Sequence, residues 1–240
     1  MYLCKGGGRV AFYQIAGLTV EMDVTGRTLQ QAAPYLVEGC EKADVVVKCD
    51  PQRILEHNPL LENLDDALYM GTGSAFSKHL LKYGGFQLHS SAVMLDGKAY
   101  LFSAPSGTGK STHTEKWCRL FGAQLLNDDK PALRRQPEGW IAYGTPWSGK
   151  HDLSTPTGVP LGGIAFLNRG QENTISLMDP GEAVAEIIRE SPRYLTMEQM
   201  QQQLTLLDQL LQEIPVWKLY CRNEDEAAYV SHAAMTKGGK

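Results

Sequence analysis

The sequence predicts an α/β fold built around a mixed β-sheet, with a small additional α/β region at the N-terminus. Two short apolar runs, residues 98–103 and 124–126, have the length and composition of buried strands. Between them, residues 112–121 carry apolar side chains at helical spacing. The third observation is that an antiparallel strand is predicted immediately before the first of these strands. Sheets whose strands are joined only by helical crossovers are parallel, so this sheet is of a different type.

The antiparallel partner is predicted from a hairpin signal. Asp96-Gly97 separates residues 88–95 from residues 98–103. A two-residue Asp-Gly loop between apolar runs favours a tight hairpin turn, because both turn positions need positive φ. Strands joined by helical crossovers are parallel instead. The sheet is therefore predicted to contain both strand directions.

A glycine-rich loop follows the second strand of the hairpin, with four residues between Ala104 and the Gly109-Lys110-Ser111 triplet. This spacing is that of a phosphate-binding loop, except that Ala104 replaces the usual glycine. Glycines let backbone N–H groups turn toward phosphate oxygens, and the following helix adds its positive N-terminal end. A glycine-rich turn with an accidental lysine is the alternative, but the strand–loop–helix order favours a bound nucleoside triphosphate. The candidate nucleotide-binding residues are Ser106, Gly107, Thr108, Gly109, Lys110, Ser111 and Thr112.

An acidic pair follows the strand at residues 124–126. The chain between Lys110 and Asp128 has room for one helix and a direct return, which brings Asp128 and Asp129 beside the loop. Such a position suits a metal-holding aspartate. We expect Ser111 and Asp128 to hold magnesium and Asp129 to act as general base toward the hydroxyl that is phosphorylated. An ordinary Asn-Asp-Asp turn is the alternative.

Two more side chains are candidates for the catalytic site. His89 lies one strand from the loop, where it is either a phosphate-binding or catalytic group or a structural strand histidine. Residues 144–151 have the composition of a mobile loop with Trp147 and Lys150 at its tip. Such a loop either covers the phosphates and brings Lys150 over the transition-state charge, or lies on the surface with Trp147 packed down as an anchor. His113, in the first helical turn, is expected to face solvent.

These residues together resemble the HPr kinase/phosphorylase group within the phosphoenolpyruvate-carboxykinase-like superfamily of P-loop proteins. The resemblance rests on residues 88–93, the hairpin turn, residues 104–112 and Asn127-Asp128-Asp129, in that order, and extends more weakly over 145–150 and 161–169. It implies the mixed-sheet P-loop core of that superfamily, and ATP-dependent phosphorylation of a hydroxyl, usually a serine. It also implies that His89 lies near the transferred phosphoryl group, that the second aspartate is the base, and an oligomeric assembly.

The chain departs from the HPr kinase pattern at several places. Thr112 stands where those kinases typically carry glutamate, and only about 85 residues precede the core. Their arginine-containing phosphorylase segment has no clear equivalent, and Lys150 is the nearest cation. HPr is therefore a doubtful substrate, and the chain is more similar to the short kinases of this superfamily. Full carboxykinases are more than twice this length.

The composition limits the classes of protein and of binding partner that are compatible with this chain. The chain has 240 residues, 42% hydrophobic and 21% charged, with a net charge of −4, which gives no footprint for nucleic acid or an anionic membrane. No apolar run approaches a membrane span and the N-terminus lacks a signal-peptide pattern. Five cysteines without metal-ligand spacing indicate reduced thiols and a cytoplasmic protein.

Apolar patterns and breakers divide the chain into a small α/β region at 1–85 and a kinase core with C-terminal helices at 86–240. Strands are predicted within 9–25 and at 44–49, 161–167 and 214–221. Helices are predicted at 28–40, 65–83, 182–189, 197–214 and 224–235.

The sequence thus predicts a kinase that uses ATP and Mg²⁺, with Asp129, Lys110, His89 and Lys150 as catalytic residues and a serine or threonine of a protein or peptide as acceptor. A small-molecule kinase with the same core is one alternative. An ATP-binding sensor that transfers nothing is the other. A sensor does not need Asp129, so this carboxylate discriminates between the readings. No nucleic acid or membrane partner is expected, and a homo-oligomer is compatible with the resemblance.

Overall fold

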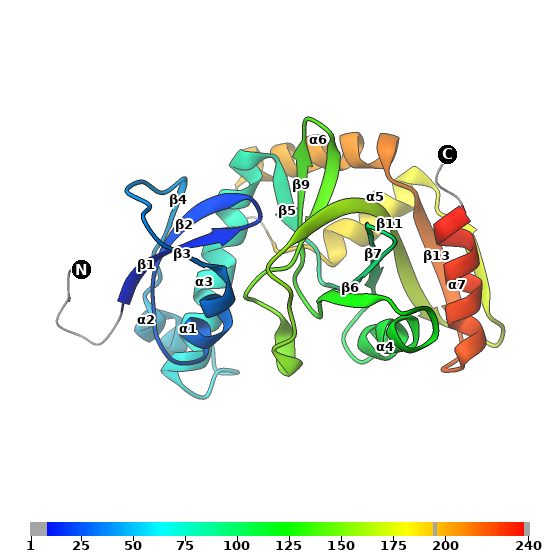
Figure 1. The fold of residues 1–240 in the computed structure, drawn as a ribbon, viewed down its shortest axis with the longest axis horizontal. Coiled ribbons are helices and arrows are strands. Elements are labelled where there is room, and N and C mark those ends of the chain that lie inside the picture. Colours follow the sequence, from blue (N-terminus) through cyan, green and yellow to red (C-terminus); the bar gives the residue numbers. More distant parts are fainter. Residues whose placement is uncertain (1–8, 194–195, 238–240) are drawn as a thin grey trace.

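Two β-sheets organise the chain (Figure 1), which the computed structural model describes over residues 9–193 and 196–237. The smaller sheet has the order β3 (Leu36–Val37), β1 (Arg9–Ile15), β2 (Leu18–Val24) and β4 (Val45–Val47). The larger sheet has the order β5 (Gly85–Gln87), β9 (Ala132–Gln136), β10 (Gly139–Tyr143), β11 (Gly158–Arg169), β7 (Lys98–Ser103), β6 (Ser90–Leu95) and β8 (Gln124–Asn127). On this sheet β13 (Val216–Cys221) pairs with both β11 and β12 (Thr174–Leu177).

The larger sheet is mixed, as predicted. Its strand β7 runs parallel to β11 and antiparallel to β6. Asp96 and Gly97 join β6 to β7 with φ of +50° and +74°, the positive values that a tight two-residue hairpin turn needs. The predicted α/β class and hairpin are therefore confirmed.

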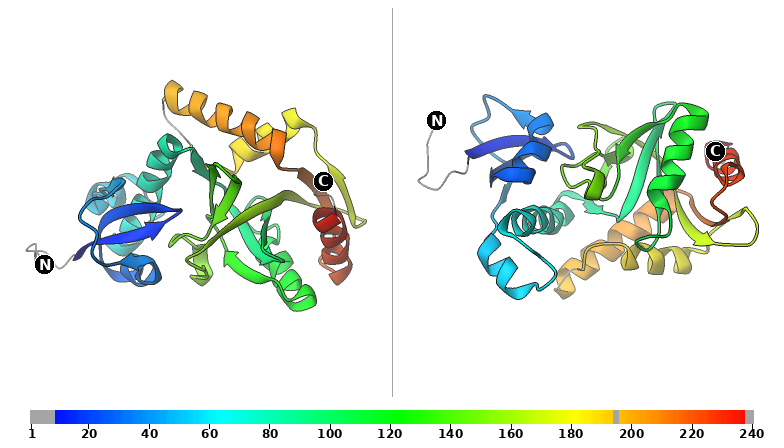
Figure 2. Two further views of the ribbon diagram at one scale, coloured as in Figure 1. Left: turned by 45° about the horizontal axis from the view of Figure 1, so that its top comes forward. Right: turned by 90° about the horizontal axis from the view of Figure 1, so that it is seen from below.

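Helices cover both faces of the larger sheet (Figures 1 and 2). On one face lie α4 (Lys110–Phe121) and α7 (Asp225–Lys237), and on the other α5 (Pro180–Arg189) and α6 (Met197–Glu213). Side chains alternate along β7, so Phe102 packs in the cluster with α4 while Leu101 packs in the cluster with α5 and α6. Within the described ranges, no helix is long and apolar enough to cross a membrane.

The smaller sheet packs against α3 (Leu64–Leu80), which lies between the two sheets in Figure 1, with α1 (Gly26–Ala32) and α2 (Pro51–His57) beside it. The same hydrophobic cluster contains Trp147, whose ring stacks on Phe76 of α3 with centroids 5.0 Å apart. A segment of the predicted kinase core is thus anchored in the core of the N-terminal region. The division of the chain near residue 85 stays a prediction.

The prediction of one helix over residues 28–40 was wrong. The helix α1 ends at Ala32, a 3₁₀ turn η1 (Ala33–Tyr35) follows, and β3 begins at Leu36. Proline has no N–H for the helical ladder and its ring clashes with the preceding turn, so Pro34 ends the helix.

The strand β10 and the start of β11 lie within residues 138–160, on either side of the segment 144–151 that was predicted as a loop. The hairpin of β9 and β10 went unpredicted, as did β5, β12 and α2. The remaining predicted helices and strands are present with ends shifted by a few residues. The helix predicted over 65–83 divides into α3 and a 3₁₀ turn η2 (Leu81–Tyr83), which ends at Gly84 in the left-handed conformation.

Candidate active site

The glycine-rich loop connects β7 directly to α4 and leaves its middle exposed. Gly107 and Gly109 have φ of +76° and +109°, which side chains rarely adopt. A Cβ added at either would meet no atom within 4 Å, so backbone conformation requires glycine there. Ala104 is buried in the cluster beneath α4, which explains why a small residue occupies this position.

Lys110 opens α4 and is buried at the base of the loop. Its Nζ donates a hydrogen bond to the carbonyl oxygen of Ala104 at 2.7 Å. Burial lowers the pKa of Lys110, while the carboxylates of Glu190, Asp129 and Asp128 act in the opposite direction. None of the ion pairs formed within 9–193 and 196–237 includes Lys110. A buried cation without a carboxylate in contact suits an anionic ligand.

The turn that follows β8 is organised by Asn127, whose side chain is completely buried. Its Oδ1 accepts from the backbone N–H groups of Asp129 at 3.0 Å and Lys130 at 2.7 Å. Its Nδ2 donates to the carbonyl oxygen of Thr145 at 2.9 Å. The segment is thus an asparagine-centred turn. This turn also fixes the positions of both aspartates.

Asp128 points toward the first turn of α4. Its Oδ1 accepts a hydrogen bond from Ser91 Oγ at 2.9 Å, and Ser91 Oγ lies 2.9 Å from Oγ1 of Thr114. Asp128 is mostly buried and lines the same cavity as Ser111. A hydroxyl from β6 therefore holds the carboxylate beside the loop.

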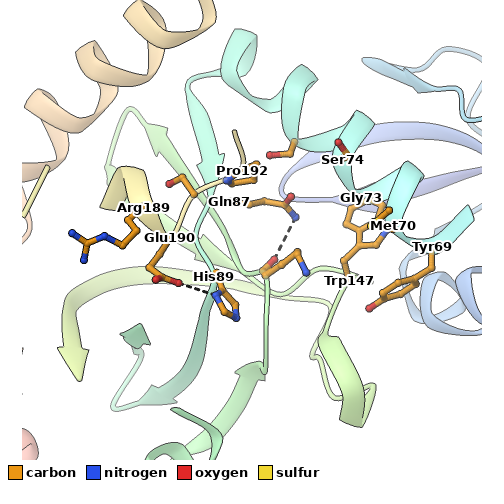
Figure 3. Close-up of a pocket in the computed structure, with 13 residues that line it drawn as sticks. Tyr69, Met70, Gly73, Ser74, Gln87, His89, Trp147, Arg189, Glu190 and Pro192 are labelled. Atoms are coloured by element: carbon orange, nitrogen blue, oxygen red, sulfur yellow. Dashed lines mark hydrogen bonds and ion pairs between the residues drawn. The ribbon is translucent and has the colours of Figure 1, made fainter. Parts of the chain in front are cut away.

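Asp129 belongs to a chain of charged groups that includes His89. Nε2 of His89 lies 3.2 Å from Asp129 Oδ1, and Nδ1 lies 2.8 Å from Glu190 Oε2 (Figure 3). Both contacts are hydrogen bonds only when each ring nitrogen carries a proton, because a carboxylate only accepts. Oδ2 of Asp129 pairs with Nζ of Lys130.

The electrostatic balance at Asp129 favours the carboxylate. Burial alone would raise the pKa of Asp129, but the hydrogen bond from His89 and the charge of Lys130 outweigh it and lower the pKa to about 2. Asp129 is therefore ionised at neutral pH and able to accept a proton.

The predicted site residues meet in one cavity of about 540 Å³. It brings together the loop, both aspartates, His89 and Lys150 from segments far apart in the sequence. Thr108 lies outside this cavity and lines a neighbouring one of about 460 Å³ on the other side of the loop, together with Lys116, Arg169 and Arg222. The predicted residues that line the first cavity are His89, Ser106, Gly107, Gly109, Lys110, Ser111, Thr112, Asp128, Asp129 and Lys150.

Lys150 lies in a 3₁₀ turn, η3 (Gly149–His151), that the N-terminal region holds in place. Tyr69 Oη of α3 accepts from the backbone N–H groups of Ser148 at 2.8 Å and Gly149 at 3.3 Å. Arg27 of α1 pairs with Asp152 at 2.7 Å and donates to the carbonyl oxygen of Gly149. The turn that carries Lys150 is thus tied to two helices of the smaller region.

Of the two alternatives for Trp147, the structure shows the one in which the indole is packed down as an anchor. Trp147 is 1% exposed, because Phe76 and the N–H···O contact to Thr72 Oγ1 at 3.2 Å hold it inside. The expectation for His113 was wrong. His113 is buried and hydrogen-bonded through Nε2 to Ser231 Oγ of α7 at 2.9 Å, so it does not face solvent. Burial lowers the pKa of His113 to about 3. This histidine joins α4 to α7 and lies outside the first cavity.

A third cavity of about 390 Å³ adjoins the first and is drawn in Figure 3. The two share Tyr69, His89 and Lys130 in their linings. One face of α3, the indole of Trp147 and residues 189–192 complete the wall. The third cavity is therefore lined by His89 and Lys130, the two residues that contact Asp129, and by no residue of the glycine-rich loop.

Sequence reasoning missed Glu190, Lys130, Ser91, Arg27 and Tyr69. Lys130 is adjacent to the acidic pair and could have been included on that ground alone. Glu190 lies 101 positions from His89, and Arg27 lies 125 positions from Asp152. No local pattern in the sequence indicates those contacts.

Comparisons with known proteins give one family match. No curated protein matches the chain. Among solved structures, the Hpr(Ser) kinase/phosphatase from Coxiella burnetii is similar at 14% identity and a TM-score of 0.38, over 63% of this chain and 97% of that chain. A likeness this distant carries no argument about function. The family model of SynChlorMet cassette protein ScmC matches residues 66–221, well over half of the chain. The chain therefore belongs to the ScmC family of SynChlorMet cassette proteins.

Proposed function

We propose that this protein is a phosphotransferase that moves the γ-phosphoryl group of magnesium-bound ATP to a serine or threonine hydroxyl of a protein or peptide. One observation carries the proposal: a buried, ion-pair-free lysine and two carboxylates converge on the cavity beside a glycine-rich loop. Phosphoryl transfer requires the protein to neutralise charge on the phosphates and to accept the proton of the attacking hydroxyl.

The residues of the cavity fit a nucleoside triphosphate and its magnesium ion. Lys110 has no carboxylate in contact within the described chain, so phosphate oxygens would complete its charge. The first turn of a helix leaves backbone N–H groups without helical partners, and α4 begins at the loop. Ser111 and Asp128 line the cavity and would hold magnesium. When bound, magnesium neutralises charge that develops on the β- and γ-phosphates.

Asp129 would receive the proton of the acceptor hydroxyl. The hydroxyl oxygen forms a bond to the γ-phosphorus, the bond to the β–γ bridging oxygen breaks, and ADP leaves. The proton passes to Asp129, which is ionised and keeps lone pairs free beside its contacts with His89 and Lys130. A strong base is not needed, because the transition state is loose and the acceptor has lost little of its proton there.

Lys150 would supply positive charge near the transferred group, and His89 would orient Asp129. His89 immediately precedes β6 and contacts Asp129, and Lys150 lies on the turn that Arg27 and Tyr69 hold. Donors aimed at developing charge in a closed site stabilise a transition state more than they do in water. We place the reaction in the cytoplasm, where ATP and magnesium are available and the four described cysteines, Cys40, Cys49, Cys118 and Cys221, stay as free thiols.

The test is transfer from γ-labelled ATP with magnesium into lysate of the source cell, by wild type and by Asp129→Asn. Protein, peptide and small-molecule fractions are counted separately. The Asp129→Asn variant is expected to keep ATP binding and to lose transfer by about a hundredfold to ten-thousandfold. The matched control is Asp208→Asn, at an exposed carboxylate of α6 that accepts a hydrogen bond from Gln212.

Each outcome selects one function. Asp129-dependent label in protein or peptide supports the proposal. Label confined to small molecules identifies a metabolite kinase with the same core. ATP binding without Asp129-dependent label in any fraction contradicts the proposal and leaves a nucleotide sensor.

A further inference from the structure

The third cavity, beside His89 and Lys130, has no role in the chemistry described so far. We propose that it binds a large apolar side chain next to the phosphorylated serine or threonine of a peptide acceptor. This inference rests on the proposed function, because it names the substrate class of the same site.

The lining of the cavity is mainly apolar. Met70, Gly73 and Trp147 form one side and Pro192 the other (Figure 3). A Cβ added at Gly73 would lie 2.9 Å from Cδ1 of Trp147, so glycine lets the indole pack directly on α3. Phe76 stacks behind that indole and fixes it as a rigid wall. A rigid apolar wall is suited to an aliphatic or aromatic group.

Polar side chains also line the cavity, and the charged ones are engaged by neighbouring groups. Lys130 pairs with Asp129, Glu190 with His89, and Arg189 with Glu186. The Tyr69 hydroxyl accepts from two backbone N–H groups of the 148–149 turn. Most of the surface that the lining exposes to the cavity is therefore apolar. An apolar side chain buries this surface without the cost of placing hydroxyl groups against it.

The position of the cavity assigns it to the acceptor and not to the nucleotide. The cavity of about 460 Å³ shares Gly107, Gly109 and Thr112 with the first cavity. The third cavity shares Tyr69, His89 and Lys130 with the first cavity. The three cavities therefore lie in a row. The glycine-rich loop lies between the cavity of about 460 Å³ and the first cavity, and His89 lies between the first and third cavities. Phosphoryl transfer needs attacking and leaving oxygens roughly in line. With the nucleoside in the cavity of about 460 Å³, this in-line geometry places the acceptor on the opposite side of the transferred phosphoryl group, beside His89.

The size of the cavity favours one residue of a peptide. About 390 Å³ lies within the range of roughly 300–1,000 Å³ found for small-ligand pockets. The hydroxyl itself must lie outside it, at Asp129 in the neighbouring cavity. A molecule that fills both places has a hydroxyl and a bulky apolar group joined by a short spacer. A serine or threonine next to a Phe, Trp, Leu or Met residue has this form.

The first experiment measures occupancy without turnover. The Asp129→Asn protein is labelled with 5-fluorotryptophan, and its four tryptophan resonances are followed by ¹⁹F NMR. The probes are serine-centred heptapeptides that are otherwise alanine, with one phenylalanine immediately before or after the serine, and the all-alanine parent. The Trp147 resonance, assigned from Trp147→Phe, is expected to shift with one phenylalanine peptide and not with the parent.

The second experiment measures specificity during transfer. Wild type is expected to phosphorylate the preferred phenylalanine peptide with a kcat/KM about tenfold to a hundredfold above that for the alanine parent, because a large apolar side chain is buried. Ser74 is exposed at the rim of the cavity, and Ser74→Phe is expected to fill it and to reduce this ratio to near one. The control Lys78→Phe, one turn along α3 and outside the lining, is expected to keep the ratio.

The outcomes separate this inference from the proposed function. Transfer to peptides with no preference for an apolar neighbour, or a preference that Ser74→Phe leaves intact, overturns the pocket assignment while the kinase stands. A Trp147 shift with no transfer by wild type to any peptide overturns the peptide kinase. ATP-dependent thermal stabilisation of Ser74→Phe serves as the check that the variant is folded.

Discussion

Glu190 holds His89 by two contacts. Its carbonyl oxygen accepts from the backbone N–H of His89 at 2.8 Å, and its Oε2 lies 2.8 Å from Nδ1 of the same residue. The side chain of Glu190 is buried at the end of α5, on the opposite side of the imidazole from Asp129. The position and orientation of the ring are therefore set by the residue that follows α5.

Removal of the Glu190 carboxylate is expected to lower kcat without weakening ATP binding. Glu190→Ala leaves Nδ1 of His89 without its acceptor, and a misplaced group near the reacting atoms can cost up to about a hundredfold. In Glu190→Gln the amide oxygen still accepts, so much of the rate is expected to return. Steady-state kinetics with varied ATP separates kcat from KM. Glu186→Ala, which removes the partly buried carboxylate paired with Arg189, is the control. A lower ATP affinity with unchanged kcat would contradict a positioning role.

Substitution of the buried lysine is expected to separate ligand binding from fold stability. ATP with magnesium at a hundred times its Kd stabilises a binding protein by about 2.7 kcal/mol. Lys110→Met is expected to lose this increment, whereas its ligand-free unfolding free energy does not fall, because a buried cation without an ion pair has been removed. Denaturant unfolding with and without ATP measures both quantities. Lys48→Met, at an exposed position, should retain the full increment. Equal stabilisation of both variants would contradict nucleotide binding at the loop.

Release of the Lys150 turn is expected to slow catalysis from a distance. Arg27→Gln removes the ion pair with Asp152 and the contact with the Gly149 carbonyl oxygen. Because the pair is partly exposed, the loss of stability is expected to stay below about 1 kcal/mol. Faster hydrogen exchange at the Ser148 and Gly149 amides and a roughly tenfold lower kcat are expected, since the cation is no longer positioned.

The control for this experiment is Arg53→Gln, at an exposed position of α2. An Arg27→Gln protein with faster exchange but unchanged kcat would show that Lys150 takes no part in the reaction.

Mild acid is expected to destabilise the fold through His113. Its folded pKa of about 3 lies below the ordinary value of about 6.5, so the unfolded chain binds the proton first. The contribution of His113 is therefore complete above about pH 6.5 and is lost as pH falls toward 3. The expected loss is about 1.4 kcal/mol per pH unit, or about 2 kcal/mol between pH 6.5 and 5.

Urea unfolding at several pH values, compared between wild type and His113→Gln, isolates this contribution because the other histidines titrate in both. Parallel stability curves for the two proteins would show that His113 becomes protonated without unfolding.

Short sequence patterns predicted those parts of the site whose conformation depends on neighbouring residues in the chain. Asp96-Gly97 specifies its own turn, and the glycines of the loop need their positive φ in whatever context they fold. The acidic pair was predictable because a short strand must return beside the loop that precedes it. These features depend on residues close together in the sequence.

The remainder depends on contacts between distant segments. Glu190 follows an ordinary amphipathic helix, and nothing around it indicates that β6 begins beside it. The strand β9 was missed because Arg134 and Arg135 interrupt its apolar pattern. In the fold, Arg134 is accommodated by the carbonyl oxygens of Ala16 and Tyr83. Tertiary partners thus satisfied charges that a sequence pattern counts against a buried strand.

The turn at Asp96-Gly97 has a consequence at the opposite end of its hairpin. The two-residue length sets Leu95 opposite Lys98, and therefore Ser90 opposite Ser103. There the hydroxyl of Ser103 donates to the carbonyl oxygen of His89 at 2.8 Å. One additional residue in the turn would shift the pairing by one and exchange the two faces of β6. An insertion at the surface, far from any phosphate or acceptor, would thereby remove the imidazole from Asp129 while most of the sheet still forms.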